Sequence, residues 1–376
     1  HLSGTGIGDL FDITVMPVVG EVTYGRGREE DPSTGMWSYA DRSQEVARPG
    51  YYSVPLTRYG ITAEMTATNR VGMHRYTFPQ SEEAGIVINL MNGGCWDRPM
   101  DAQIERVDPM TGQPDPNGQA LRGYRYSRGW ADDQKVYFYA EFSKPFKDFK
   151  VIRGDIQIWQ DEFKDMAAFA HAYFEAEPQE QIMMKVALSP VSMEGAYANM
   201  KAELSGWDFE ATAKAADQAW NEELGKIKVE GKDKEALKIF YTALYHAMIA
   251  PSTFCDVDES YQTYTTFSLW DTYRAAMPLY SIFQSERYTD MINTMLAIYK
   301  EQGKLPVWHL HGCETNCMVG NPGIIPVADA IVKGFPRIDY ELAFEAMKAS
   351  ALRPDRGQEH RMKYGYIPCD LMNESV

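Results

Sequence analysis

The sequence predicts an α+β chain of two parts, an antiparallel β-sandwich over residues 1–206 and an incomplete helical array over residues 233–376. The first part consists of short β-branched or aromatic runs, often alternating in polarity, that end at Gly, Pro, Asn or Asp. In the second part the apolar residues recur at helical spacing. Many strands without intervening helices favour a large sandwich.

Individual elements follow from the same patterns. The clearest strand candidates are residues 61–68, 86–90, 135–142 and 182–188. Residues 207–232 are predicted to form a helical linker, because the run 208–224 places Phe209, Ala213, Ala216 and Trp220 on one side and charges on the other. Further helices are predicted at residues 234–250, 271–283, 286–301, 323–334 and 339–352.

The predicted helices do not account for a complete domain. Apolar faces such as that of Ile239, Ala243 and Ala247 need neighbours that the sequence does not supply. The chain also starts at His1 without a methionine and stops at Val376 directly after a turn-like segment. We therefore expect a fragment that lacks the extreme N-terminus and the C-terminal half of the helical domain.

Composition narrows the class of ligand. The 376 residues are 44% hydrophobic and carry 37 Lys plus Arg against 53 Asp plus Glu, a formal charge of -16. This charge opposes nucleic acid or an acidic membrane surface and favours a neutral ligand. No apolar run approaches the roughly 20 residues of a membrane helix, and no leader is visible. The five cysteines do not form a disulfide framework, and no protein partner is predicted.

Two irregular segments carry the functional signal. Residues 268–274 contain Trp270, Asp271 and Arg274, and residues 305–318 contain Trp308 and Glu314. A flat aromatic face beside carboxylates and a guanidinium suits a sugar, whose C–H face stacks on the ring while its hydroxyls need donors and acceptors. Saccharide chemistry is therefore the leading functional class.

Each of these residues also has a purely structural interpretation. Asp271 could be the N-cap of the helix that follows it. Glu314 could be a solvated loop carboxylate, and Arg274 could form an ion pair on a helix surface. Packing is favoured over sugar stacking for Trp308, whereas both roles are open for Trp270.

Three other motifs are rejected as sites. Residues 256–260 begin like an EF-hand loop, but the sixth position is Tyr261 and the twelfth is Phe267. The glycine-rich residues 4–8 are not followed by a strand–helix unit, which favours a simple turn over a phosphate loop. The remaining motif combines ligand types that zinc accepts, namely His309, His311, Cys313 and Cys317.

Longer strings of the chain resemble the glycoside hydrolase family 92 α-mannosidases, calcium-dependent exo-acting enzymes of gut Bacteroidetes. The opening His-Leu-Ser-Gly-Thr-Gly is similar to that family's H-L-S-G-T-G. Further matching strings lie at residues 61–70, 74–79, 127–131, 142–146, 240–246, 268–274 and 306–318. The three first zinc candidates, His309, His311 and Cys313, fall at variable positions of the family's W-x-x-x-G-x-E-T-x-C-M string, which argues against zinc.

The resemblance implies a β-sandwich packed on an (α/α)6 toroid, of which this chain holds the first part, with the active site and a bound Ca²⁺ between them. Members remove terminal α-linked mannose with inversion. An inverting mechanism uses a general acid and a general base about 6.5–9.5 Å apart. The resemblance also implies a secreted or periplasmic location and an N-glycan or mannan substrate, here with α-1,2 linkages.

The resemblance places the acid and base beyond Val376, in strings of the kinds E-G-N-A-W-Q-Y and G-N-x-D-x-G-Q-M-S-A that are absent here. The catalytic residues and the calcium ligands of this chain therefore stay unknown. The residues expected to bind substrate are Trp270, Asp271, Arg274, Glu314, Thr315 and Cys317.

One departure affects linkage preference, since residues 321–323 are Asn-Pro-Gly where many relatives have His-Ser. Two alternatives stay open. One is a catalytically silent mannose-binding relative, and the other is a glycoside phosphorylase on the same architecture.

Overall fold

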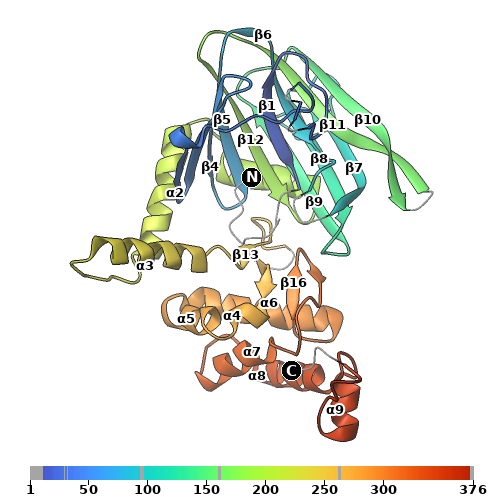
Figure 1. Cartoon of the computed structure of the whole chain (residues 1–376), viewed down its shortest axis with the longest axis vertical. Coiled ribbons are helices and arrows are strands. Elements are labelled where there is room, and N and C mark those ends of the chain that lie inside the picture. Colours follow the sequence, from blue (N-terminus) through green and yellow to red (C-terminus); the bar gives the residue numbers. More distant parts are fainter. Residues whose placement is uncertain are drawn as a thin grey trace. The chain divides into compact units, whose positions relative to one another are not determined.

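The computed structural model describes residues 12–28, 30–31, 33–93, 97–159, 162–260 and 264–372. Strands come first and helices second along the chain (Figure 1), which confirms the predicted fold class. The chain forms two compact units, His1–Gly225 with Asp256–Asp258, and Lys226–Cys255 with Glu259–Val376. The predictions on residues 1–8 lie outside the described residues.

The first unit contains two antiparallel sheets. The smaller sheet has the strand order β1-β6-β11-β10 and the larger has the order β2-β3-β4-β5-β12-β9-β8-β7. The strands of the smaller sheet are β1 Thr14–Val19, β6 Ser81–Asn89, β11 Glu162–Ala176 and β10 Asp148–Trp159. Those of the larger are β2 Val46–Arg48, β3 Tyr51–Leu56, β4 Ile61–Ala67, β5 Val71–Phe78, β12 Glu180–Ser189, β9 Gln134–Phe142, β8 Ala120–Arg128 and β7 Arg98–Val107. A short 3-10 helix, η1, covers Arg42–Gln44.

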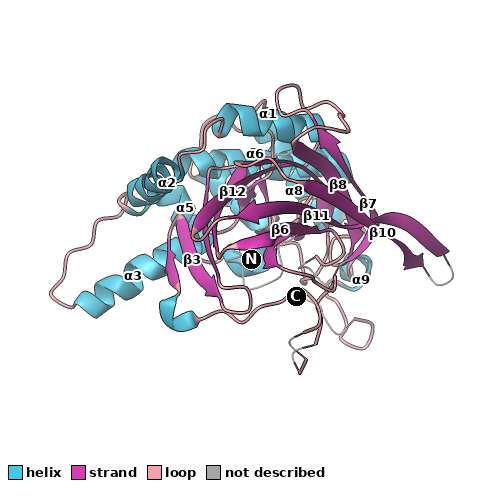
Figure 2. Ribbon diagram, turned by 90° about the horizontal axis from the view of Figure 1, so that it is seen from above, coloured by secondary structure: helices cyan, strands magenta, loops and turns pink. Residues whose placement is uncertain are grey.

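Period-two alternation gives the larger sheet two buried faces. On β5, Tyr76 and Phe78 belong to the core between the sheets, whereas Val71 and Met73 belong to a second core under helices. These helices are α1 Met193–Glu203 and α2 Phe209–Leu224. Within this unit the layers are therefore helices, larger sheet and smaller sheet (Figure 2).

Helix α1 is absent from the predictions, whereas α2 matches the predicted run 208–224. The two helices begin alike, because Ser192 accepts a hydrogen bond from the Gly195 N–H and Asp208 accepts one from the Ala211 N–H. The difference lies in the buried face. In α1 the buried residues are Ala196, Asn199 and Met200, so its apolar periodicity is weak.

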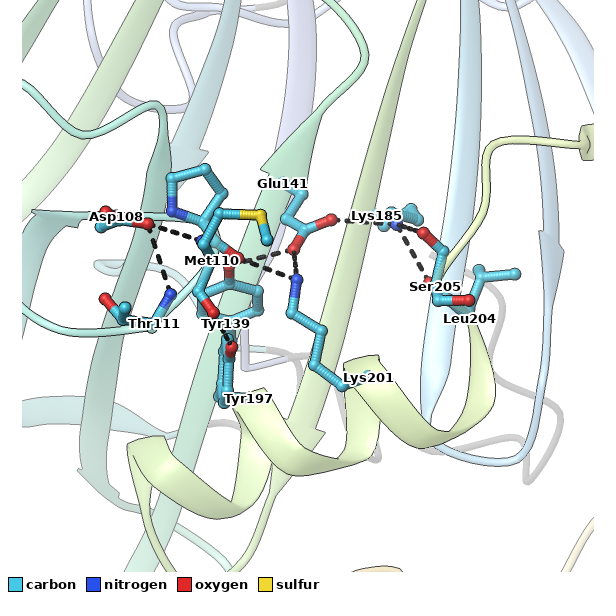
Figure 3. Close-up of polar contacts among 11 residues, drawn as sticks. Asp108, Met110, Thr111, Tyr139, Glu141, Lys185, Tyr197, Lys201, Leu204 and Ser205 are labelled. Carbon is cyan, nitrogen blue, oxygen red and sulfur yellow. Dashed lines mark hydrogen bonds and ion pairs between the residues drawn. The ribbon is translucent and has the colours of Figure 1, made fainter.

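A charged cluster fixes α1 to the larger sheet (Figure 3). The Glu141 carboxylate lies between two ammonium groups, with its Oε2 3.0 Å from Lys185 Nζ and its Oε1 2.5 Å from Lys201 Nζ. Tyr139 donates to the same carboxylate at 3.0 Å. Burial raises the pKa of Glu141, but the hydrogen bonds from Lys201 and Lys185 outweigh it and hold that pKa below its ordinary value.

Lys185 connects this cluster to the end of α1. Its side chain is fully buried, its Nζ donates to the Leu204 carbonyl at 3.0 Å, and it lies 4.3 Å from the centre of the Trp207 ring. Lys201 meanwhile donates to the Pro109 carbonyl at 2.9 Å. The cluster therefore joins two strands, α1 and the loop between β7 and β8.

Residues Asp256–Asp258 contribute to the first unit although they are distant from it in sequence. The Asp256 carboxylate accepts hydrogen bonds from Ser189 Oγ and Asn199 Nδ2, both at 2.7 Å. A Cβ atom at Gly195 would lie 2.1 Å from Asp256 Oδ2, so only glycine allows this approach. The EF-hand-like segment thus places its first carboxylate against neutral donors of the sandwich.

The second unit is largely helical. Its helices are α3 Lys234–Ala247, α4 Leu269–Thr272, α5 Ala276–Phe283, α6 Ser285–Gln302, α7 Ile324–Val332, α8 Tyr340–Leu352 and α9 Gln358–Tyr364. Its short strands are β13 Ser252–Thr253, β14 Tyr264–Thr265, β15 Phe267–Ser268, β16 Trp308–Leu310 and β17 Cys313–Glu314. The core gathers around α6, where Tyr288, Ile292 and Met295 are fully buried. None of the helices in the described part of the chain is long and apolar enough to cross a membrane.

Two predictions about these helices need comment. The single helix predicted over residues 271–283 is wrong, because the structure has two helices, α4 and α5, with a break at residues 273–275. The prediction of apolar faces without neighbours agrees with the exposure of large side chains. Ile239 is 62% exposed, Ile282 78%, Phe344 64% and Val332 86%.

A buried histidine in the sandwich predicts acid sensitivity. The His171 ring stacks on Tyr173 with centroids 3.8 Å apart, and its Nδ1 lies 3.0 Å from the Tyr24 hydroxyl. Burial, followed by the charge of Lys150, lowers the pKa of His171 from 6.5 to about 4. The unfolded chain therefore binds this proton more readily than the folded chain, so stability is full above pH 6.5 and falls as the pH drops toward 4.

We expect His171 to contribute a loss on the order of 2 kcal/mol between pH 7 and pH 5. In the His171→Phe variant, the decrease in unfolding free energy between these pH values should be smaller by about this amount. Urea unfolding at both pH values measures the decrease. An equal decrease in both proteins would contradict the assignment, even if the variant is less stable at pH 7.

Candidate functional site

The structure brings the two predicted functional segments together in one small sheet, β15-β16-β17. Ser268 pairs with Trp308, and His309 pairs with Glu314. The Leu269 N–H also donates to the Val307 carbonyl at 3.2 Å. The segment that carries Asp271 leaves one edge of this sheet, and the segment that carries Glu314 forms the other edge, roughly 10 Å away at the spacing of adjacent strands.

Glu314 organises its own loop. Its Oε2 accepts a hydrogen bond from the Val307 N–H at 2.7 Å, and its Oε1 accepts from the N–H groups of Trp308 at 2.9 Å and Asn316 at 2.8 Å. The side chain is half-buried. The interpretation as a solvated loop carboxylate is therefore wrong, and any sugar contact of Glu314 would use the lone pairs that remain.

Asp271 is the exposed carboxylate of the site. It lies at the third position of α4, whose N-cap is Ser268, so the interpretation of Asp271 as the N-cap is wrong. The Ser268 hydroxyl donates to Asp271 Oδ2. The Oδ1 of Asp271 accepts no hydrogen bond from the described part of the chain, which leaves this oxygen open to a ligand hydroxyl.

Arg274 lies against two aromatic rings. Its guanidinium carbon is 4.7 Å from the centre of the Tyr273 ring and 5.4 Å from that of Trp270. Arg274 is exposed and Trp270 is half-buried. Among the described residues Arg274 forms no ion pair, so its donors remain available to a polar ligand.

Thr315 and Cys317 follow Glu314 on the same loop. Thr315 donates to the Trp308 carbonyl through its hydroxyl at 2.8 Å and through its N–H at 3.0 Å. Trp308 is only 5% exposed, which agrees with the packing role favoured for it. Cys317 is exposed and its thiol is free. Of this pair, Cys317 presents its side chain to solvent and Thr315 turns its hydroxyl to the backbone.

Sequence reasoning missed a buried cation beside this loop. Lys304 is 5% exposed, and its Nζ donates to Asn316 Oδ1. Burial lowers the pKa of Lys304, although Glu314 and Asp355 raise it. The sequence feature that could have indicated this buried cation is a lysine between Gly303 and the apolar Leu305, since a charge at the start of an apolar segment needs a specific partner.

The histidines of the rejected zinc motif have other surroundings. Burial is the main reason why the pKa of His309 is lowered to about 4. The His311 ring stacks on Phe254 with centroids 5.7 Å apart. His311 also has φ +49, at the turn between β16 and β17.

The described residues do not form a recognisable metal centre. No group of three or more His, Cys, Asp or Glu among them could hold a metal ion. Calcium requires six to eight oxygen ligands. We therefore assign no calcium ligand among the described residues.

Comparisons with known proteins agree with this arrangement. Residues 1–189 match the family model described as the glycosyl hydrolase family 92 N-terminal domain, and residues 195–376 match that of the family 92 catalytic domain. The chain therefore belongs to glycosyl hydrolase family 92.

Solved relatives share the fold along nearly the whole chain. A family GH92 α-mannosidase from Bacteroides thetaiotaomicron is 34% identical with a TM-score of 0.88, and the match covers 98% of this chain and 52% of that one. The same enzyme has been solved in complex with mannoimidazole. A family GH92 inverting mannosidase from that organism is 26% identical with a TM-score of 0.76, covering 95% of this chain and 49% of that one.

A curated relative also matches nearly the whole chain. An uncharacterized secreted glycosidase of Arthroderma benhamiae is 27% identical over 407 residues, which cover 98% of this chain and 48% of that protein. The chain thus spans about half the length of the relatives it matches.

Proposed function

We propose that the chain forms the β-sandwich and the first part of the catalytic domain of a Ca²⁺-dependent inverting exo-α-mannosidase. The substrate class is a terminal α-mannoside of an N-glycan or mannan, with α-1,2 linkages, and the location is secreted or periplasmic. Family membership and the two mannosidase relatives support this proposal. The curated secreted relative supports the location.

One observation carries the substrate assignment. The exposed Asp271 carboxylate and the Arg274 guanidinium, with its aromatic neighbours, lie on the segment that directly follows β15, in the same small sheet to which the Glu314 loop belongs. This combination offers hydrogen-bond acceptors, donors and a flat apolar surface to a hexose. The charges of Asp271 and Arg274 also make the site polar without making it strongly cationic, which suits a neutral sugar better than phosphate.

The chemistry requires two further carboxyl groups. In an inverting reaction a general acid protonates the leaving glycosidic oxygen while a general base activates a water on the opposite face of the sugar. We assign neither role to Glu314, because its carboxylate is held by three backbone N–H groups. Calcium, when bound, would favour distortion of the sugar ring, and we name no ligand for it.

The proposal is tested by comparing this chain with the longer protein that we expect to contain it. The longer protein should hydrolyse 4-nitrophenyl α-mannoside, release β-mannose as the first product by proton NMR, and lose activity in EDTA. The 376-residue chain should give no turnover under the same conditions. Measurable hydrolysis by this chain would place the acid and base within it and would contradict the assignment.

A further inference from the structure

Asn316 is held at three points, although it lies at the exposed surface of its loop. Its N–H donates to Glu314 Oε1 at 2.8 Å, and its carbonyl accepts from Arg356 Nη1 at 2.9 Å. Its side-chain oxygen accepts from Lys304 Nζ. The residue also has φ +50, a left-handed conformation that asparagine tolerates better than most residues.

Lys304 determines which way the Asn316 carboxamide faces. An ammonium group has three donors and no acceptor, so only the oxygen of the carboxamide can face it. The amide nitrogen is then on the opposite side of the planar group. Asn316 Nδ2 donates to no acceptor in the described part of the chain, and along the sequence Asn316 stands between Thr315 and Cys317, two residues predicted to bind substrate.

The burial of Lys304 indicates a specific purpose for this contact. The ammonium group forms no ion pair with the described carboxylates, and its one side-chain acceptor is Asn316. Burying a charge whose side-chain hydrogen-bond acceptor is neutral costs free energy that an apolar residue would not require, and the charges of Glu314 and Asp355 offset this cost only in part. Such groups are retained in some proteins because they select one arrangement among several. Here the selected arrangement is the orientation of an exposed amide.

We propose that Lys304 is a positioning residue that fixes Asn316 so that its Nδ2 donates a hydrogen bond to a hydroxyl oxygen of the bound sugar. This inference rests on the proposed mannoside site and adds a donor to the acceptors Asp271 and Glu314. A sugar hydroxyl both donates and accepts, so a site that selects one hydroxyl configuration needs fixed partners of both kinds.

The decisive variant is Asn316→Asp in the longer protein. Its carboxylate still accepts from Lys304, now as an ion pair, so the loop and the thermal midpoint should be retained. The substituted group offers the sugar an acceptor in place of the donor. We expect mannoimidazole to bind about 10- to 100-fold more weakly by calorimetry, with KM for 4-nitrophenyl α-mannoside raised by a similar factor.

Two further comparisons separate positioning from general stability. Lys304→Gln retains a donor for Asn316 Oδ1, whereas Lys304→Met does not, so binding should be substantially better in the Gln variant. Asn293→Asp on α6 is the matched control, since among the described residues Asn293 donates only to the Arg337 carbonyl. This control should bind mannoimidazole like the unsubstituted protein.

The outcomes are distinguishable. If the unsubstituted protein neither hydrolyses the mannoside nor binds mannoimidazole, both the proposed function and this inference fail. If it does both, but Asn316→Asp binds as tightly as the Asn293→Asp control, the inference alone is overturned. A large loss of thermal stability in Asn316→Asp would also count against it, because Lys304 should then not be its partner.

Discussion

Replacing Glu141 by alanine should destabilise the sandwich by about 3–5 kcal/mol. The substitution leaves the fully buried Lys185 ammonium without its carboxylate and removes the partner of Lys201. Since Lys201 is on α1, the variant should also loosen the attachment of that helix to the larger sheet. Chemical denaturation of the intact chain, followed by a spectroscopic signal of the first unit, measures the change in unfolding free energy.

The matched control for this prediction is Glu175→Ala. Glu175 forms an ion pair with Lys147 at 2.5 Å, but the side chain is 63% exposed, and exposed pairs contribute roughly 0–1 kcal/mol. The double variant Glu141→Leu with Lys185→Met should recover much of the stability, because it removes both buried charges together. Equal effects of Glu141→Ala and Glu175→Ala would contradict the role given to the buried cluster.

Replacing Glu314 by alanine should destabilise the second unit by about 2–4 kcal/mol. The carboxylate satisfies three backbone N–H groups, and a hydrogen bond to a charged group contributes roughly 1.5–3 kcal/mol, offset in part by water that enters the half-buried position. Glu314→Gln should have a smaller effect, since one amide oxygen still accepts. Thermal unfolding of the second unit measures the stability, and circular dichroism near 280 nm, to which Trp308 contributes together with the other aromatic residues, compares the folded states.

An exposed glutamate of the same unit provides the control for Glu314. Within the described part of the chain, Glu345 on α8 accepts one hydrogen bond, from the Tyr299 hydroxyl, so Glu345→Ala should change the unfolding free energy by less than about 0.5 kcal/mol. A stable Glu314→Ala variant with an unchanged circular dichroism spectrum near 280 nm would show that the loop does not depend on the carboxylate. Glu314 would then again be a candidate for binding the sugar with carboxylate oxygens that the loop does not need.

Much of the fold could be predicted from the sequence because its signals are local. Alternation identified strands such as β4, and helical spacing identified α2 and α6. Helix α1 was not predicted because its buried side is short and contains Asn199. The Asn199 side chain donates to Asp256, a residue far away in sequence. No local pattern shows a contact of that kind.

The candidate site was predicted in part for the same reason. The residue types of the two segments identified Asp271, Arg274 and Glu314, and the small sheet brings these segments together. The hydrogen bonds of Glu314 and the burial of Lys304 depend on how the chain returns on itself, so composition could not reveal them. Helix α4 also begins at Leu269, two residues before the predicted start, directly after Ser268, which pairs with the distant Trp308.

The central claim is that this small sheet presents Asp271 to a mannoside, and mannoimidazole binding by Asp271→Asn in the longer protein tests it most directly. The substitution replaces a charged acceptor with an amide of the same shape at an exposed position of α4, so folding should be unaffected. We expect affinity to fall about 10- to 100-fold, the effect of losing a hydrogen bond to a charged group. Unchanged affinity in a folded variant would contradict the claim and place the sugar elsewhere.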